Sequence, residues 1–364
     1  MGVAVGAVGA IGAVDAARLL SEAQALLERR ELDAAEVQVR RAEAAGADAD
    51  GCAAGLWTVH MLRGEFEEAW RQSDAIRARG APDPHRFWNG EPVEAKRVIV
   101  RCLHGLGDAV QMMRYMPALE RLCAELTVEV PPALVEPARW FDGVHRVITW
   151  GADAPPEAPD WDVQVEVMEL PYLFRTRLAE LPLAERYLKL PEEVRDAARR
   201  AMGVPGLPRV GFVWAAGEWN PARSLPVELV GRMVAATRCE CWNLQGGRHR
   251  TDWAHVPGTA ATRDACEVGE GIVSLAAAIE QLDLVITVDT LAAHLAGALG
   301  IPAWVLVQHA ADWRWMAAGR DSPWYPTVRL YRQGAPGDWA GVVDDVVCDL
   351  QAWAARRPET PRAG

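Results

Sequence analysis

The sequence lacks several patterns that would assign it to common classes of protein. Its seven cysteines include no C-x2-C pair, and Cys239 and Cys241 are too closely spaced for the usual zinc-ligand pattern, so we expect no metal site and a reducing compartment. No uninterrupted apolar stretch is long enough to span a bilayer. Residues 1–20 are apolar but lack a basic segment and are broken by glycines, which argues against a signal peptide. These absences favour a cytoplasmic protein without a membrane span.

Basic residues are fewer than acidic residues. The chain of 364 residues has 50 acidic against 38 basic residues, for a formal net charge of -12. This balance argues against a nucleic-acid partner, because a phosphate backbone is bound by a basic surface. A chain of this length is expected to form two or three domains, and its 50% hydrophobic residues are enough to fill their cores.

Proline is absent from residues 15–80, which are rich in Ala, Glu and Arg and predict antiparallel helices. The segments LLERRELDAAE and HMLRGEFEEAW align at a spacing of 34 residues, with Leu32 on Phe66 and Ala35 on Ala69. That spacing is the period of a tetratricopeptide repeat, and a plain four-helix cap is the alternative. Prolines at 82–84 break the helical pattern, so we predict a small all-α, tetratricopeptide-like domain over 1–88.

From residue 96 onwards the sequence predicts α/β structure, in which strands alternate with helices. The expected strands are 97–103, 126–130, 144–150 and 161–170, then others beginning at 209, 241, 284 and 303. The expected helices are 108–124, 133–140, 226–237, 274–282 and one starting near Thr290. A proline-bearing linker at 191–208 is expected between the two sets. We therefore predict two Rossmann-like domains, 89–200 and 201–364, that face a cleft, where ligands often bind.

The stretch 282–306 carries the strongest functional signal. Its run 284–288 is apolar and β-branched without alternation, which is typical of a strand covered on both faces, and it ends at Asp289-Thr290. Such a strand-to-helix corner lies at the carboxyl edge of the sheet, where free N–H groups at the helix start attract phosphate. His294 lies one helical turn beyond Thr290 and could reach the same ligand; a satisfied core histidine is the alternative.

A second corner is predicted at HGLGDAVQMMRYMPAL. Gly105 and Gly107 allow a close backbone approach, but the third glycine of a dinucleotide-binding fingerprint is missing, so we do not predict NAD. Asp108 follows in the first helical turn, where its carboxylate is expected to face the other domain. A helix cap is the alternative role for Asp108.

Three further residues fall at predicted strand ends of the second domain. Arg223 could bind a diphosphate, and Ser224 could cap the next helix. Gln245 could contact a ribose or a base. The alternatives are an exposed arginine for Arg223 and a plain turn at Gln245.

The chain resembles bacterial tetratricopeptide-repeat glycosyltransferases of the family 9 kind, related to ADP-heptose:lipopolysaccharide heptosyltransferases. The resemblance covers nearly the whole chain and rests on HGLGDAVQMMRYMPAL at 104–119, RSLP at 223–226, LDLVITVDTLAAHLAGALG at 282–300, and DWRW with RDSPWYPTVRLYRQ at 312–333. It implies a GT-B fold and transfer of a hexosyl or heptosyl group from a nucleotide-diphosphate sugar, with no resident cofactor. It also implies that Asp108 is the general base, that Arg223 adds positive charge, and that the donor diphosphate is cradled by Asp289, Thr290, Leu291, Ala292 and His294.

The chain departs from the family pattern in two places. Leu103-His104 stands where Glu-Gln is usual, and the segment 215–222 is shorter and lacks the customary histidine and aspartate. Both departures bear on acceptor choice and turnover.

The chemistry expected is single displacement with inversion, without a metal. The one D-x-D of the α/β part, Asp160-Trp161-Asp162, leads into a strand of the first domain rather than the donor domain. Two alternatives stay open: a non-catalytic interaction scaffold, and a nucleotide-sugar epimerase or hydrolase on the same fold. The acceptor is a glycan, a protein recruited by the helical domain, or a small molecule.

Overall fold

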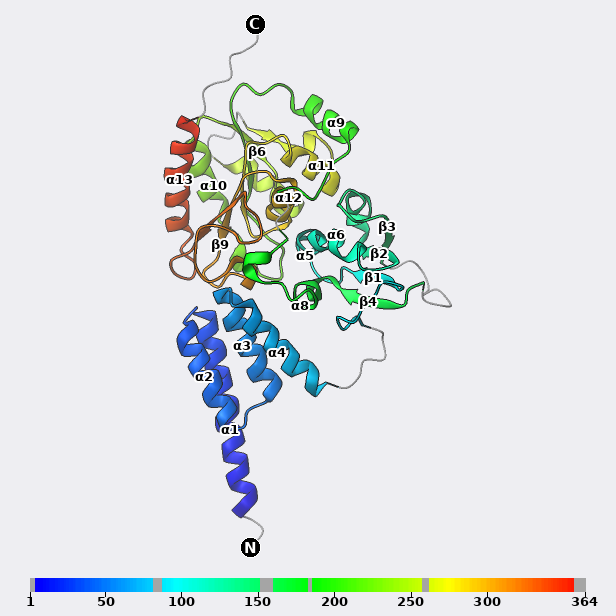
Figure 1. Ribbon diagram of the computed structural model, residues 1–364. Coiled ribbons are helices and arrows are strands. Elements are labelled where there is room, and N and C mark those ends of the chain that lie inside the picture. The colour runs from blue at the N-terminus through cyan, green and yellow to red at the C-terminus, as the bar shows by residue number, and fades with distance from the viewer. Residues whose placement is uncertain (1–3, 81–86, 151–159, 183–184, 257–261, 357–364) are drawn as a thin grey trace. The chain divides into compact units, whose positions relative to one another are not determined.

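The computed structural model describes residues 4–80, 87–150, 160–182, 185–256 and 262–356 (Figure 1). The chain divides into two compact units, of which the first combines residues 1–84 with the segments 171–181 and 309–319, and the second holds the remainder. The helix break expected at 82–84 lies outside the described residues. No helix in the described ranges has both the length and the apolar character needed to cross a bilayer.

The first unit is built on helices in the region where antiparallel helices are predicted. They are α1 (Ala4–Glu28), α2 (Leu32–Ala44), α3 (Ala49–Arg63) and α4 (Phe66–Arg79). Leu32 and Phe66 begin α2 and α4, so the 34-residue offset in the sequence is also an offset between helices. Ala35 and Ala69 are fully buried; α2 packs on α1, and α4 packs on α3. Small residues at these two positions let the helix axes approach closely.

The two later segments of the chain complete this helical unit. Trp313 packs edge-on against Trp57 of α3, with ring centroids 5.8 Å apart, and the Ala317 N–H donates to the Leu62 carbonyl at 2.9 Å. From the other segment, the Thr176 carbonyl accepts from Trp70 Nε1 at 2.8 Å. The Arg175 guanidinium binds Asp74 and lowers the pKa of that carboxyl. Periodicity within residues 15–80 gave no indication of these contacts, because their partners lie more than a hundred residues away.

The second unit holds two fully parallel sheets. The first sheet has the order β3-β2-β1-β4, formed by β1 (Arg97–Arg101), β2 (Glu125–Val130), β3 (Arg146–Thr149) and β4 (Val163–Glu166). The helix expected over 108–124 is instead three short pieces, α5 (Leu106–Met112), a 3-10 turn at Met113–Tyr115, and α6 (Met116–Glu120). Pro117 lies in the first turn of α6 and supplies no N–H, which explains the break. The helix expected at 133–140 is reduced to α7 (Val135–Ala138) after a 3-10 turn.

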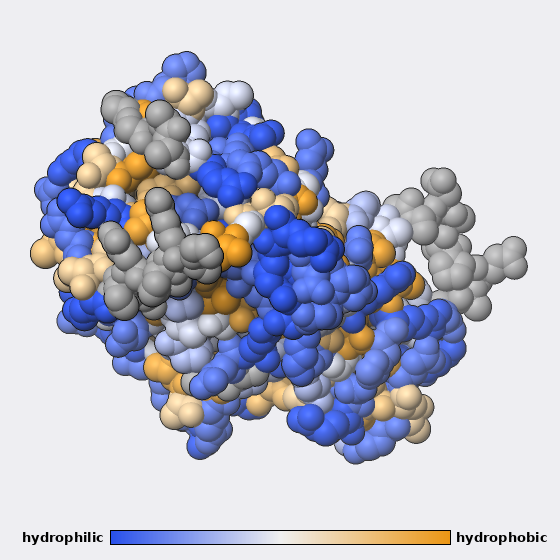
Figure 2. Space-filling view, turned by 90° about the horizontal axis from the view of Figure 1, so that it is seen from above, coloured by the Kyte–Doolittle hydropathy of each residue, from blue (hydrophilic) through white to orange (hydrophobic). Residues whose placement is uncertain are grey.

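The second sheet has the order β10-β9-β8-β5-β6-β7. Its strands are β5 (Arg209–Val213), β6 (Glu240–Asn243), β7 (Arg263–Asp264), β8 (Leu284–Val288), β9 (Ala303–Val307) and β10 (Val328–Arg332). Its helices are α10 (Val227–Ala235), α11 (Gly271–Ile279), α12 (Leu291–Leu299) and α13 (Trp339–Ala355). Every residue of β5, β8 and β9 is buried, as the non-alternating apolar runs predict. The face seen in Figure 2 is mostly hydrophilic, with apolar residues in small separate groups, because most large apolar side chains lie in the core.

Most of the linker expected at 191–208 is a helix, α9 (Glu192–Met202), which the sequence analysis did not predict. Pro191 is the N-cap, where a proline does not interrupt a helix, and the segment EEVRDAARRAM consists largely of strong helix formers.

The strand orders define where ligands are expected. In the first sheet, the chain runs from β1 to β2 and β3 on one side and returns to β4 on the other. In the second sheet, β6 and β7 lie on one side of β5, and β8 to β10 lie on the other. The topological switch points are therefore between β1 and β4 and between β5 and β8, and open α/β sheets bind ligands at the carboxyl ends of such strand pairs.

Gly300 ends α12 in the left-handed region, with φ +72°, and a Cβ there would lie 2.6 Å from the Glu185 carbonyl oxygen. We expect Gly300→Ala to lower the free energy of unfolding by about 2–4 kcal/mol, from backbone strain and steric overlap together. Gly337→Ala is the control, since Gly337 has φ +82° but no atom within 4 Å of the added Cβ, and we expect it to cost about 1–2 kcal/mol. Urea unfolding of both variants gives the comparison, and equal losses would contradict the predicted overlap.

Candidate functional site

The corner between β8 and α12 is the centre of the candidate site. Thr290 is the N-cap of α12 in an extended conformation, but its side chain does not cap the helix; its Oγ1 lies 3.0 Å from Thr287 Oγ1. The Ala293 N–H donates to the Thr290 carbonyl at 3.1 Å, whereas the Leu291 and Ala292 N–H groups have no acceptor among the described residues. A helix start with N–H groups of this kind attracts an anion.

Arg223 lies at the same corner, at the end of a 3-10 turn after β5. Its Nη1 donates to the Asp289 carbonyl at 3.1 Å and lies 3.6 Å from Asp289 Oδ2. Its guanidinium also stacks on the Trp219 ring at 4.2 Å from the centroid, and its side chain is 13% exposed. Both the arginine and the helix start therefore place positive potential at the switch point between β5 and β8.

His294 is deeply buried behind this corner. Its side chain is 2% exposed, its Nδ1 lies 2.9 Å from the Tyr325 hydroxyl, and its Nε2 lies 3.9 Å from Asp289 Oδ1. Burial raises the pKa of Tyr325 well above its usual range, so this hydroxyl stays protonated and can donate to the histidine. The geometry is that of a satisfied core histidine that supports Asp289, and direct contact of His294 with a ligand stays a prediction.

The corner between β1 and α5 carries Asp108. Gly105 is the N-cap of α5, and Asp108 is the third helical residue, whose Oδ2 accepts the Gly105 N–H at 3.0 Å. Asp108 thus caps the start of its own helix, from the third helical position rather than from the N-cap position. Its side chain is only partly buried, so this role leaves it accessible to a substrate.

The two corners meet where Gly107 faces His294. A Cβ on Gly107 would lie 2.6 Å from His294 Cδ2, so only glycine lets α5 and α12 approach this closely. The expected close approach at Gly107 is therefore an approach to another part of the protein. Contact with a ligand at Gly107 stays a prediction.

Arg114, in the 3-10 turn after α5, contacts the segment that precedes β10. This buried guanidinium donates to the Trp324 carbonyl at 2.5 Å and to the Tyr187 hydroxyl at 3.2 Å, and lies 4.6 Å from the centroid of the Tyr325 ring. The Tyr325 hydroxyl in turn bonds to His294. Aromatic rings and carbonyl groups surround this cation and link the first sheet's helix to segments of the second sheet.

Ser224 and Gln245 accept backbone N–H groups of the loop after β5. Ser224 does not cap the next helix: its Oγ accepts the Ala216 N–H at 3.1 Å, and the N-cap of α10 is Pro226, whose ring holds the backbone ready for a helix. Gln245 Oε1 accepts the N–H groups of Trp214 and Ala215 at 3.0 and 2.8 Å. Gln245 therefore ties the end of β6 to the end of β5, and a contact with a ribose or base stays a prediction.

The D-x-D segment is used in ion pairs of the first sheet. Asp160 binds Arg97 and Arg146, and Asp162 binds Arg97 at 3.0 Å. Within the described ranges, no group of three or more His, Cys, Asp or Glu side chains is arranged to hold a metal ion.

Several residues of the site carried no role in the sequence analysis. Trp219, Tyr325, Arg114 and Gln111 all lie within or beside segments that were singled out, but their contacts depend on tertiary structure. Gln111 is fully buried one turn beyond Asp108, and neither atom of its amide has a partner among the described residues.

Comparison with known proteins gives one curated relative and several structural ones. Protein FlbA of Caulobacter vibrioides is 24% identical over 336 residues, which cover 82% of this chain and 54% of the relative. The chain thus spans about half the length of the curated relative that it matches. No protein-family model matches the chain.

Among solved structures, the glycosyl transferase of family 9 from Veillonella parvula superposes with a TM-score of 0.54 at 13% identity, covering 73% of this chain and 99% of that chain. The ADP-heptose LPS heptosyltransferase II of E. coli gives a TM-score of 0.53 at 12% identity, covering 71% of this chain and 99% of that chain. The chain therefore has the fold of these two glycosyltransferases, and the predicted resemblance to family 9 is confirmed at the level of the fold.

A buried amide without partners costs free energy, which gives a test of Gln111. We expect Gln111→Leu to raise the free energy of unfolding by about 1–3 kcal/mol, because the apolar side chain removes two unpaired polar atoms at similar volume. Gln111→Ala is the comparison and should lower it, because it leaves a cavity. Denaturant unfolding measures both variants. A loss of stability in Gln111→Leu would show that the amide is hydrogen-bonded in solution.

Proposed function

We propose that the protein is a glycosyltransferase that moves a sugar from a nucleotide-diphosphate donor to an acceptor hydroxyl, with inversion at the anomeric carbon and without a metal. The observation that supports this most is the juxtaposition of two corners. One offers the Leu291 and Ala292 N–H groups and Arg223, and the other offers the Asp108 carboxylate, and they meet at Gly107 and His294. A GT-B arrangement, with the donor on the second sheet and the acceptor on the first, follows from this assignment.

The reaction needs charge stabilised on one side and a proton removed on the other. In the proposed step, Asp108 takes the proton of the acceptor hydroxyl while that oxygen forms a bond to the anomeric carbon. The bond from the anomeric carbon to the diphosphate oxygen breaks, and the nucleoside diphosphate leaves with the electron pair. The start of α12 and Arg223 stabilise the negative charge that develops on this leaving group.

The fold supports this class of reaction and suggests the first donors to try. The two solved structures described above are named a glycosyl transferase and an ADP-heptose heptosyltransferase. ADP-heptose and ADP-hexoses are therefore the first donors, with hexosyl or heptosyl transfer as the two outcomes. Fold alone does not fix function, so the proposal rests on the site.

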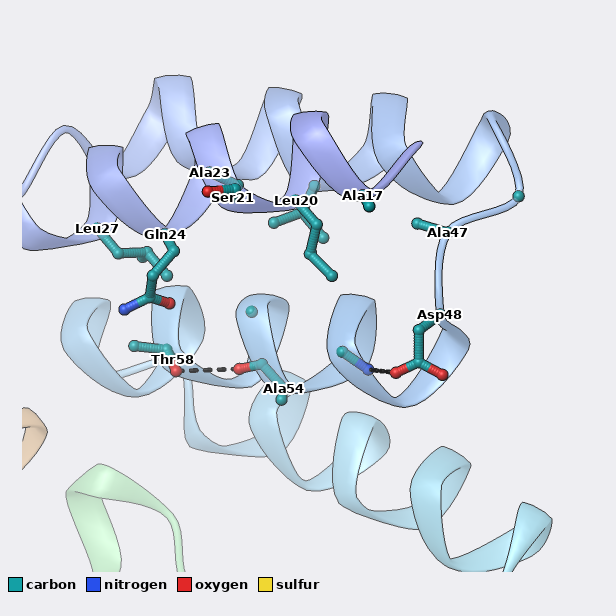
Figure 3. A pocket seen from close by; sticks show the side chains of 14 residues that line it. Ala17, Leu20, Ser21, Ala23, Gln24, Leu27, Ala47, Asp48, Ala54 and Thr58 are labelled. Atoms are coloured by element: carbon teal, nitrogen blue, oxygen red, sulfur yellow. Dashed lines mark hydrogen bonds between the residues drawn. The ribbon is translucent and has the colours of Figure 1, made fainter. Parts of the chain in front are cut away.

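The helical unit is proposed to act as a tetratricopeptide-like module that recruits the acceptor or its carrier, in the cytoplasm. A groove of about 660 Å³ opens between α1 and α3, lined mainly by small and apolar side chains together with Ser21, Gln24 and Thr58 (Figure 3). Gln24 and Thr58 lie on opposite walls of this groove, and the Thr58 hydroxyl donates to the Ala54 carbonyl (Figure 3). A protein or glycan acceptor is compatible with such a module.

Donor binding is tested by thermal denaturation of the purified protein with ADP-, UDP-, GDP- and dTDP-sugars. A ligand that binds only the folded protein raises the melting temperature, so the true donor class gives a concentration-dependent shift. Incubation of that donor alone then separates the alternatives: consumption without acceptor indicates a hydrolase or epimerase, and strict dependence on acceptor indicates a transferase. If no sugar nucleotide binds, the protein is a scaffold and the proposal is wrong.

Asp108→Asn is expected to reduce transfer by about 10²–10⁴-fold, because the amide cannot accept the hydroxyl proton. Donor binding should be unchanged, since Asp108 lies outside the donor corner. The amide oxygen can still accept the Gly105 N–H, so the fold is preserved. Release of nucleotide measures turnover and calorimetry measures binding. Full turnover in Asp108→Asn would show that Asp108 is not the general base.

Arg223→Ala is expected to weaken donor binding by about 10- to 100-fold, through loss of charge-assisted hydrogen bonds to the diphosphate. Arg232→Ala is the control, because Arg232 carries the same charge on the exposed side of α10, where it pairs with Asp344. Calorimetric titration with the donor measures both. Equal effects would show that only the net charge matters.

A further inference from the structure

Glu166 lies at the carboxyl end of β4, across the switch point of the first sheet from the corner that carries Asp108. In the β1–β4 register it stands beside Arg101. The Arg101 guanidinium is committed elsewhere, to Glu129 at 2.5 Å and to Gln164 at 2.6 Å. The Glu166 side chain is 13% exposed, so it is a largely buried carboxyl, and none of the described arginines forms an ion pair with it.

The contacts of Glu166 lead into the turn between β1 and α5. Its Oε2 accepts the Met168 N–H at 2.7 Å and lies 3.7 Å from His104 Nε2. Its Oε1 has no hydrogen-bond partner among the described residues. Burial raises the pKa of Glu166, and the exposed Glu169 adds to this, while the Met168 and Leu103 N–H groups and His104 act in the opposite direction. Burial is the largest of these effects, so the pKa of Glu166 lies above its ordinary value.

Asp108 holds the same turn from the other side. Its carboxylate accepts the N–H of Gly105, the residue directly after His104. Residues 103–105 thus connect two carboxyl groups, one buried at the end of β4 and one at the start of α5. His104, with a side chain that is 58% exposed, is the titratable group between them.

We infer that Glu166 is a positioning residue for the candidate base: its contacts with the Met168 N–H and with His104 hold the 103–105 turn, and hence Asp108, in its working position. This inference rests on the proposed function. Turnover is therefore expected to fall on the acid side, because protonation of Glu166 weakens its contacts with the Met168 N–H and His104.

The stability of the protein gives an independent readout. A carboxyl whose pKa is raised by folding favours the folded state at low pH, and this contribution is lost as the pH rises through the folded pKa. Glu166→Gln removes the buried charge while its amide oxygen can still accept the Met168 N–H. We therefore expect the variant to be at least as stable as the natural protein at pH 8, with the difference shrinking towards pH 4.

The closing experiment compares Glu166→Gln, His104→Gln and His104→Lys with the control Glu169→Gln, which removes a nearby exposed carboxylate. Turnover is followed from pH 5 to 9 as nucleotide released from the sugar nucleotide that gives the largest thermal shift. Hydrogen exchange of residues 103–112 is measured over the same range. Glu166→Gln and His104→Gln should lower kcat on the order of tenfold, flatten the pH profile and speed exchange in the turn, well short of the ~10²–10⁴-fold loss expected for the base.

His104→Lys keeps a cationic partner beside Glu166 and should retain more turnover than His104→Gln. Profiles of Glu166→Gln and Glu169→Gln that both superpose on that of the natural protein would overturn the inference. Faster exchange in Glu166→Gln would show that Glu166 holds the turn. If Asp108→Asn nevertheless keeps full turnover, Asp108 is not the base, and the proposed function fails instead of the inference. The failure of the inference and the failure of the proposed function are thus distinguishable.

Discussion

The close approach of Gly107 to His294 is the constraint on which the rest of the site depends. A Cβ at residue 107 would overlap the imidazole at 2.6 Å, so the helix starts of the two sheets share one narrow space. The imidazole is fixed by the Tyr325 hydroxyl, and the Tyr325 ring lies against the buried Arg114 cation. The position of Asp108 relative to the start of α12 therefore follows from packing behind the site, in a region that excludes water and keeps polar contacts strong.

The electrostatics of the site are divided between the two sheets. At the β5–β8 switch point, the start of α12 and Arg223 supply positive potential, and Arg223 Nη1 contacts both the Asp289 carbonyl at 3.1 Å and Asp289 Oδ2 at 3.6 Å. At the β1–β4 switch point lie two carboxyl groups, Asp108, which is partly exposed, and Glu166, which is largely buried. One edge is thus suited to an anionic leaving group and the other to the removal of a proton.

In the helical unit, two segments that are distant in the sequence, 171–181 and 309–319, pack against the helices. Segments that leave the ends of β4 and β9 supply Trp313 against Trp57 and the Thr176 carbonyl to Trp70. The second pair of helices is thus covered by the protein itself. The groove between α1 and α3 stays accessible (Figure 3).

Local patterns were enough to predict most strands and helices, the corners at Asp108 and Asp289-Thr290, and the 34-residue offset, because apolar periodicity, glycine and proline act over a few neighbouring residues. They did not predict β7, β10 or α13. They misjudged the 108–124 helix, where Pro117 divides the segment, and the linker that contains α9. Three features depend on tertiary contacts: the burial of His294, the hydrogen bond of Ser224 to the loop after β5, and the position of Glu166 across from the Asp108 turn. Those outcomes depend on side chains brought together from distant parts of the chain, and no local pattern records which strand end will lie beside which.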